Sequence, residues 1–282
     1  MIIILYGIKA MKEYKVKDHV SSFLPEDREW KLVWHDEFDG PELDTSKWYY
    51  RMHMVGKRHK TYIEDAISFD GNSNIIFHLV EKDGMYYSST LQTGENYTDR
   101  PNGEGKNIPP KFMHKYGYYE VRCKLQHERP WWTAFWLQAP NVALLEDPKE
   151  GGVEVDIMES FKPGTYIPHF NHWGGYGENH QFENTAGFER YANDEDAIPI
   201  SLDEYHTFAV HWDKTGYTFY VDGKQCGKKL SKAVSETEQF ILLFTECQGH
   251  RTIPGYDNIV EFGSGLKDEF VVDYVRVFDE VE

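Results

Sequence analysis

Short runs in which apolar and polar residues alternate recur along most of this chain, with turn residues between them. A period of two is the pattern of a β-strand with one face on a core. Only the stretch near residues 228–236 has a composition compatible with a helix. The clearest predicted strands are Ile75–Glu81, Tyr87–Gln92, Tyr116–Leu125, Trp132–Leu137, Val153–Glu159, Thr207–Trp212, Thr218–Val221, Phe240–Thr245 and Glu269–Phe278.

Turn signals separate these strands. Asp70-Gly71-Asn72, Asp83-Gly84 and Asp222-Gly223 indicate antiparallel hairpins. Many short strands with turns between them predict an all-β sandwich. The sequence contains no linker, low-complexity tract or internal repeat, so we expect a single domain over residues 30–282. Residues 1–29 lack a clear period and are expected to be an N-terminal extension.

Two long polar segments, residues 94–113 and 174–198, are rich in Gly, Asn, Asp and Glu. Loops of this length in a compact domain are usually functional or disordered. Two interpretations stay equally open, a functional rim around a binding site and a passive insertion.

Three carboxylates, Glu154, Asp156 and Glu159, interrupt the apolar strand predicted at residues 153–159. Charge on a partly buried strand face requires compensation by partners or by function. In a regular strand Glu159 would point away from the other two, because it lies five residues from Glu154. A β-bulge at Ile157-Met158 would return it to their face, and bulges are enriched beside active sites.

The spacing of the two glutamates indicates a reaction type. Four strand steps of roughly 3.3 Å separate their backbones by about 13 Å, and two inward-reaching side chains leave roughly 5 Å between the carboxyl groups. Retaining glycosidases need about 5 to 5.5 Å, whereas inverting enzymes need roughly 6.5 to 9.5 Å. Asp156 between them would hydrogen-bond one glutamate and raise the proton affinity of the site. The competing interpretation is an acidic, solvent-exposed strand face.

Trp132, Ala134 and Trp136 share one face of the predicted strand that precedes these acids. Flat indole surfaces beside a small residue suit the apolar C–H faces of sugar rings. The same tryptophans would also suit a core. Their combination with paired carboxylates favours a saccharide cleft.

Composition and net charge limit the classes of ligand that this protein is expected to bind. The 282 residues are 40% apolar and 16% aromatic, which is typical of a globular β-protein, and the net charge is −17. An acidic protein is a poor binder of nucleic acids and other polyanions, which are held by Lys and Arg, so a neutral ligand is expected. The basic cluster at residues 57–60 weakens this inference. The widely spaced Cys123, Cys226 and Cys247 predict buried free thiols.

The first eight residues are apolar, but no basic residue precedes them and charged residues follow at once. This is a poor signal peptide and too short to span a membrane, so no membrane partner is expected and localisation stays open.

Five segments, in order, resemble glycoside hydrolase family 16, and the similarity covers roughly residues 30–279. The resemblance implies a β-jelly-roll of two curved antiparallel sheets with a concave substrate cleft. It also implies retaining endo-hydrolysis of β-linked glucans or galactans, with secretion or a periplasmic location. The segments are Trp34–Gly40, Lys115–Arg122, Thr133–Leu137, Glu154–Glu159 and Val272–Val277.

Within this resemblance Glu154 matches the nucleophile, Asp156 the assisting acid and Glu159 the general acid/base. The longer motif form found here is similar to that of laminarinases, agarases and related galactanases. His172 and Trp173 match a segment near the cleaved bond, with His172 expected to bond the nucleophile or the substrate. The further candidates for binding sugar hydroxyls are Glu246 and Gln248.

No cofactor is expected to be required. The resemblance implies a structural calcium held by Asp273 and backbone carbonyls, although this carboxylate would also suit an arginine partner. We expect a monomer that acts on a β-linked polysaccharide. The alternatives are a transglycosylase on the same substrates, since a glycosyl-enzyme can pass its sugar to an acceptor hydroxyl, and a non-catalytic carbohydrate-binding jelly roll.

Overall fold

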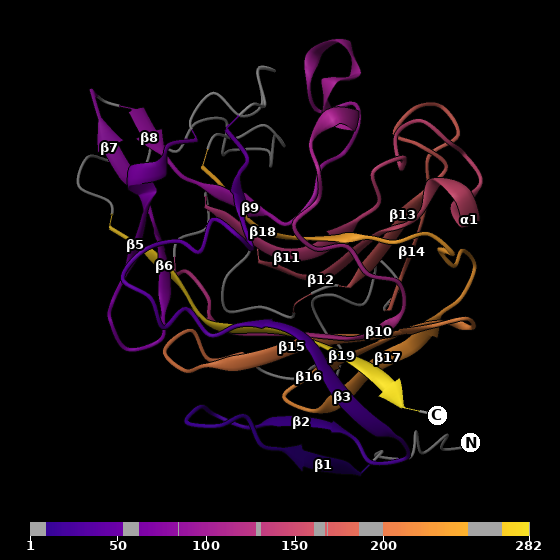
Figure 1. Ribbon diagram of the computed structural model, residues 1–282, viewed down its shortest axis with the longest axis horizontal. Helices are drawn as coiled ribbons and strands as arrows, with labels where there is room; N and C mark the ends of the chain where they lie inside the picture. Colours follow the sequence, from indigo (N-terminus) through magenta and orange to yellow (C-terminus); the bar gives the residue numbers. More distant parts are fainter. Residues whose placement is uncertain are drawn as a thin grey trace, which may run out of the picture.

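Two antiparallel β-sheets stack face to face in the computed structural model (Figure 1), which describes residues 10–52, 62–83, 85–127, 131–160, 167, 169–185, 200–247 and 267–281. This is the predicted all-β jelly-roll sandwich. The seven-stranded sheet has the order β14 (Gln181–Asn184), β13 (Phe170–Trp173), β12 (Glu154–Ser160), β11 (Trp132–Gln138), β18 (Phe240–Glu246), β9 (Thr90–Gln92) and β4 (Tyr49–Tyr50).

The eight-stranded sheet lies on the other side of the core. Its order is β17 (Lys224–Leu230), β16 (Gly216–Val221), β15 (His206–Asp213), β10 (Gly117–Lys124), β19 (Glu269–Val281), β6 (Ile75–His78) and β5 (Ile67–Phe69), and β3 (Glu29–Asp36) also pairs with β19. Two hairpins lie outside these sheets, namely β1 (Met11–Tyr14) with β2 (Ser22–Pro25) and β7 (Val80–Lys82) with β8 (Met85–Tyr87).

Helical segments are short in the described part of the chain. They are α1 (Pro148–Gly151) and the 3₁₀ segments η1 (Glu64–Ala66) and η2 (Pro101–Asn107). In the described ranges, none has the length and apolar character needed to cross a bilayer.

All nine predicted strand runs overlap strands of the structure, but the helix predicted near residues 228–236 is wrong. Its first residues belong to β17, which pairs with β16. Cys226 and Leu230 of β17 are buried in the core. Local helix preference is a weak prior, and here pairing and burial override it.

The predicted turn at Asp222-Gly223 joins β16 to β17. Val221 pairs with Lys224, and the two residues between them have φ values of 49° and 70°. Two positive φ values suit the tight hairpin turn that follows the twist of the strands. Gly71 likewise has φ 72° in the turn between β5 and β6, whereas Gly84 lies outside the described residues.

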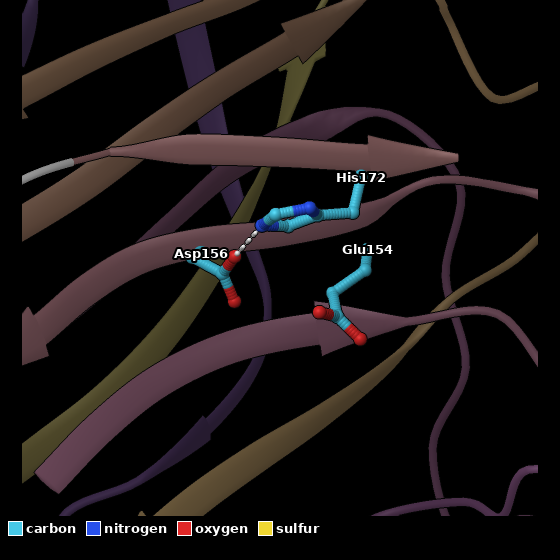
Figure 2. Close-up of side chains that lie close together, drawn as sticks. All are labelled: Glu154, Asp156 and His172. Atoms are coloured by element: carbon cyan, nitrogen blue, oxygen red, sulfur yellow. Dashed lines mark ion pairs between the residues drawn. The ribbon is translucent and has the colours of Figure 1, made fainter. Parts of the chain in front are cut away.

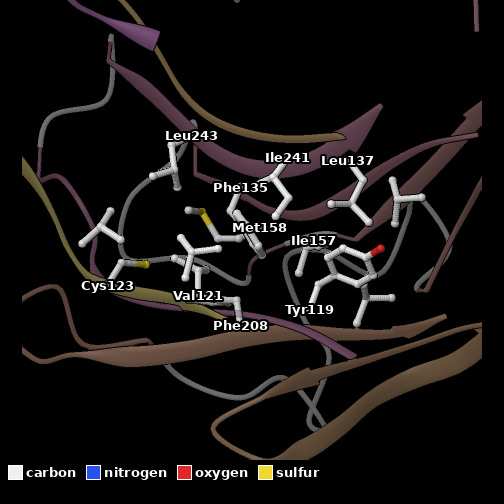
Figure 3. Close-up of a cluster of buried hydrophobic side chains, with 14 of the residues drawn as sticks. Tyr119, Val121, Cys123, Phe135, Leu137, Ile157, Met158, Phe208, Ile241 and Leu243 are labelled. Atoms are coloured by element: carbon white, nitrogen blue, oxygen red, sulfur yellow. The ribbon is translucent and has the colours of Figure 1, made fainter. Parts of the chain in front are cut away.

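The main core fills the space between the two sheets (Figure 3). Tyr119, Val121 and Phe208 come from the eight-stranded sheet and meet Phe135 and Leu243 of the seven-stranded sheet. All three cysteines are buried and free, as predicted.

The residues that precede Trp30 pack against the domain. The hairpin of β1 and β2 lies against the face of the eight-stranded sheet that points away from the core (Figure 1). Leu24 is buried there with Trp30, Tyr118 and Phe278 in a second apolar cluster. Residues 10–29 therefore cover a sheet face that would otherwise expose apolar surface.

Candidate active site

A β-bulge lies in β12 at the predicted place. Along the β11–β12 pair, Phe135 is opposite Met158 and Trp136 is opposite Asp156, so Ile157 is the extra residue. Ile157 and Met158 are both fully buried in the core. The bulge thereby returns Glu159 to the face that carries Asp156, which confirms the prediction made from the five-residue spacing.

The imidazole of His169 forms a hydrogen bond with the backbone of this bulge. Its Nδ1 lies 2.7 Å from the carbonyl oxygen of Ile157, and its ring stacks on Phe219 at 4.8 Å. Because a carbonyl only accepts, Nδ1 carries the proton and donates it. Burial lowers the pKa of His169 to about 4, so the ring is neutral at physiological pH.

This burial predicts a pH-dependent contribution to stability. The pKa of His169 is depressed in the folded state, so its contribution is complete above pH 6.5 and is lost as the pH falls from 6.5 towards 4. The loss amounts to about 3 kcal/mol. His169→Gln keeps an N–H donor that does not titrate, so urea unfolding of the variant should depend less on pH over this interval. Parallel stability curves for the two proteins would contradict the assignment.

The three carboxylates line one cleft on the face of the seven-stranded sheet that points away from the core. Asp156 is 5% exposed and Glu159 is 6% exposed, while Glu154 is partly buried. Both long polar segments contribute to the rim, one through Asn96, Thr98 and Asp99 and the other through Tyr176 and His180. The functional interpretation of these loops is the one that the geometry favours.

Glu154, Asp156 and His172 converge from β12 and β13 (Figure 2), with ligand-type atoms within 4.8 Å of one another. His172 lies opposite Glu154 in the strand register, yet its Nε2 contacts Asp156 Oδ2 at 3.4 Å. Its Nδ1 lies 3.0 Å from Nε2 of His180. His172 therefore contacts Asp156 and does not form the hydrogen bond expected with the nucleophile Glu154. Its contact with the substrate stays a prediction.

Gln138 and Tyr176 supply the hydrogen bonds of Glu154. Nε2 of Gln138 lies 3.3 Å from Glu154 Oε2, and the Tyr176 hydroxyl donates to the same oxygen. Desolvation, and then the negative charge of Glu154, raise the pKa of Tyr176 well above its usual value, so the phenol is protonated. Sequence reasoning missed both residues, because Tyr176 lies in an irregular loop and Gln138 at a strand end.

The tryptophans predicted to line the cleft do so. Trp132 and Trp136 line the cleft together with Phe244 of β18. Phe244 packs edge-to-face against both indoles, with centroids 5.0 and 6.1 Å away. Glu246 lies opposite Trp132 in the register and is buried on the same sheet face. Gln248 lies outside the described residues.

Trp173 is corrected by the structure. Side chains alternate along β13, so His172 faces the cleft while Trp173 points to the opposite side. Trp173 is 8% exposed and belongs to the main core cluster. Its sequence neighbourhood suggested a cleft residue, but the strand period assigns it to packing.

Arg51 is a cleft residue that the sequence interpretation did not identify. It bonds Asp99 at 2.5 Å, and its guanidinium lies 5.6 Å from the centroid of the Trp136 ring. The side chain is 5% exposed, and its Nε has no hydrogen-bond partner among the described residues. A buried N–H without an acceptor is costly, so a bound group that supplies one would be stabilised here.

Asp273 pairs with Arg122 at 2.5 Å. Burial raises the pKa of Asp273, and the guanidinium opposes this shift. The guanidinium of Arg122 therefore already neutralises the carboxylate that would bind calcium. Among the described side chains, no metal-type cluster includes Asp273. Calcium here stays a prediction, and no catalytic step depends on it.

Comparison with known proteins places residues 30–280 against the family model described as "Beta-porphyranase A-D, GH16 domain". The chain is 26% identical over 272 residues to "Glucan endo-1,3-beta-glucosidase A1" of Niallia circulans, covering 88% of this chain and 38% of that protein. It is 32% identical over 130 residues to "Beta-porphyranase D" of Zobellia galactanivorans, covering 44% of this chain and 28% of that protein. The matched segments thus cover well under half the length of each of these two relatives.

A similar fold occurs in the catalytic domain of an endo-1,3-beta-glucanase from Thermotoga petrophila. The TM-score is 0.66 at 23% identity, and the match covers 90% of this chain and all of that domain. At this identity the likeness concerns the sandwich itself.

Proposed function

Because this chain belongs to the family of β-porphyranase A–D GH16 domains, we propose that it hydrolyses internal β-glycosidic bonds of a polysaccharide with retention of configuration. The observation that carries the proposal is the β12 bulge, which brings Glu154, Asp156 and Glu159 to one cleft lined by indoles.

The carboxylates perform two displacements in this proposal. Glu154 attacks the anomeric carbon while Glu159 protonates the departing glycosidic oxygen, which gives a glycosyl ester and a free chain end. Glu159, now ionised, takes a proton from water, and the water oxygen attacks the same carbon and releases Glu154. The bond to the leaving sugar breaks in the first step, and the ester bond breaks in the second.

Asp156 assists the general acid in this proposal. It shares the cleft face with both glutamates and contacts His172. A nearby carboxylate favours the protonated form of its neighbours, which is the form that a general acid needs before bond cleavage.

For the substrate, we propose an anionic β-galactan of the porphyran type, in which sulfate groups replace some hydroxyls. The family description and the relative named β-porphyranase D support this choice. Arg51 supports it chemically, because guanidinium groups pair well with oxyanions and, among the described residues, its Nε meets no acceptor while Asp99 bonds another of its nitrogens. This proposal departs from the neutral polymer that the net charge of −17 suggests.

Reducing-end assays on porphyran, chemically desulfated porphyran and laminarin test this substrate. We expect porphyran to be cleaved fastest, and Arg51→Met to lower kcat/KM on porphyran about 10- to 100-fold, the range of one hydrogen bond to a charged group. The same variant should lose much less on the desulfated polymer. Equal losses on both polymers, or faster cleavage of laminarin by the wild-type protein, would exclude the anionic galactan.

A further inference from the structure

We propose that Tyr176 and Gln138 together hold the non-attacking oxygen of Glu154 and set the rate at which the covalent glycosyl-enzyme breaks down. The inference rests on the proposed double displacement and assigns two positioning residues to it. It concerns the second step more than the first.

The contacts around Glu154 single out one oxygen. The Tyr176 hydroxyl and Gln138 Nε2 both donate to Oε2. Gln138 Nε2 also donates to the Tyr176 oxygen at 2.7 Å, so the three groups form a closed triangle. An amide has two N–H donors and a phenol has one, which accounts for all three bonds. Among the described residues no hydrogen bond reaches Oε1, which leaves that oxygen to attack.

The backbone places Tyr176 for this contact. Gly174 and Gly175, which follow β13, have φ values of 79° and 73°. A Cβ on Gly174 would lie 2.3 Å from the carbonyl oxygen of Asn179, so only glycine fits this turn. The turn brings Tyr176 to the cleft, where the residue as a whole is 46% exposed and its hydroxyl donates to Glu154.

The two hydrogen bonds affect the two displacements in opposite ways. Glu154 loses negative charge as it bonds to the sugar and regains the charge as the ester breaks. Donors on Oε2 stabilise the charged carboxylate, so they weaken Glu154 as a nucleophile and improve it as a leaving group. Removing a donor should therefore slow ester breakdown and let the glycosyl-enzyme accumulate.

Tyr176→Phe tests this assignment, because it removes the hydroxyl and keeps the ring. We expect kcat to fall about 10- to 100-fold, as for one hydrogen bond to a charged group, with KM falling at least as much, so that kcat/KM, which reports the first displacement, is unchanged or raised. Intact-protein mass spectrometry of samples quenched during turnover should then show a glycosylated species that is scarce in the wild-type protein. Gln138→Met should shift the same quantities in the same direction.

The matched control is Tyr205→Phe. The Tyr205 hydroxyl lies outside the cleft and donates to Asn74 at 2.8 Å, so its removal should leave kcat and KM unchanged. A Tyr176→Phe protein that lost kcat/KM as strongly as kcat, without accumulating the covalent species, would overturn the inference. An inactive wild-type protein would instead refute the proposed function, so the two failures are distinguishable.

Discussion

Glu154→Gln is expected to lower kcat about 10⁴-fold or more, since removing a nucleophile abolishes the covalent route and leaves only binding and positioning. The substitution is nearly isosteric, and the amide retains an oxygen that can accept from Gln138 and Tyr176. The loss should thus appear in turnover without a matching loss of thermal stability.

Glu159→Gln should lower kcat about 10² to 10⁴-fold on a polysaccharide, the usual range for a general acid or base. Its effect should depend on the leaving group. When the substrate is an aryl glycoside of an acidic phenol, the phenolate leaves without needing a proton. The first displacement should then be nearly as fast in the variant as in the wild-type protein. Measuring the initial burst of phenol release separates the two glutamates.

Glu236→Gln is the control for both substitutions. Glu236 is an exposed glutamate that pairs with Lys149 outside the cleft, and its loss should leave turnover unchanged. Hydrolysis at near wild-type rates in Glu154→Gln would contradict the assigned nucleophile.

The second large effect is expected from Arg276→Met. Arg276 is fully buried and bonds both oxygens of Glu37, at 2.9 and 2.7 Å. It also donates to the carbonyl of Val20 and to Ser22, which in turn bonds the buried Glu120 at 2.6 Å. Methionine would leave two carboxylates buried without their cation, at a cost of about 3 to 5 kcal/mol in the free energy of unfolding.

Urea unfolding at neutral pH measures this cost, with Lys12→Met as the matched control. Lys12 pairs with Glu29 at 2.9 Å, but both side chains are more than half exposed. An exposed pair contributes about 0 to 1 kcal/mol. If both variants lost the same small amount, Arg276 would not be the tether between the N-terminal hairpin and the sheet.

This network also explains two of the segments that carried the family resemblance. Glu37 lies in Trp34–Gly40 and Arg276 in Val272–Val277, and β3 pairs with β19 so that these two distant segments lie side by side. Their similarity to the family therefore reflects the packing of the fold. The motif at Glu154–Glu159 reflects the chemistry.

Sequence reasoning predicted the elements whose own period is strong. The alternating runs became strands, and the five-residue spacing of Glu154 and Glu159 correctly required a bulge at Ile157-Met158. The alternation of β11 also assigned Trp132 and Trp136 to the cleft. In each case one local rule, the side-chain period of a strand, was sufficient.

The remainder depended on contacts between distant segments. Arg51 reaches the cleft from the position after the short strand β4, and Tyr176 reaches it from an irregular loop. No local pattern marks either as a site residue. The motif around Trp173 indicates a cleft residue, whereas the alternation of β13 places its side chain in the core. The short strands β1 and β2 were missed because four residues each are too few to show a period.

Azide rescue tests the central claim, the opposite roles of Glu154 and Glu159, most directly. In Glu159→Ala an added azide should attack the glycosyl-enzyme in place of water and give a β-glycosyl azide. In Glu154→Ala azide should replace the nucleophile and give the α-glycosyl azide. Proton NMR of the products distinguishes the two. The reverse pattern, or rescue of neither variant while the wild-type protein hydrolyses the substrate, would contradict the double displacement proposed for this cleft.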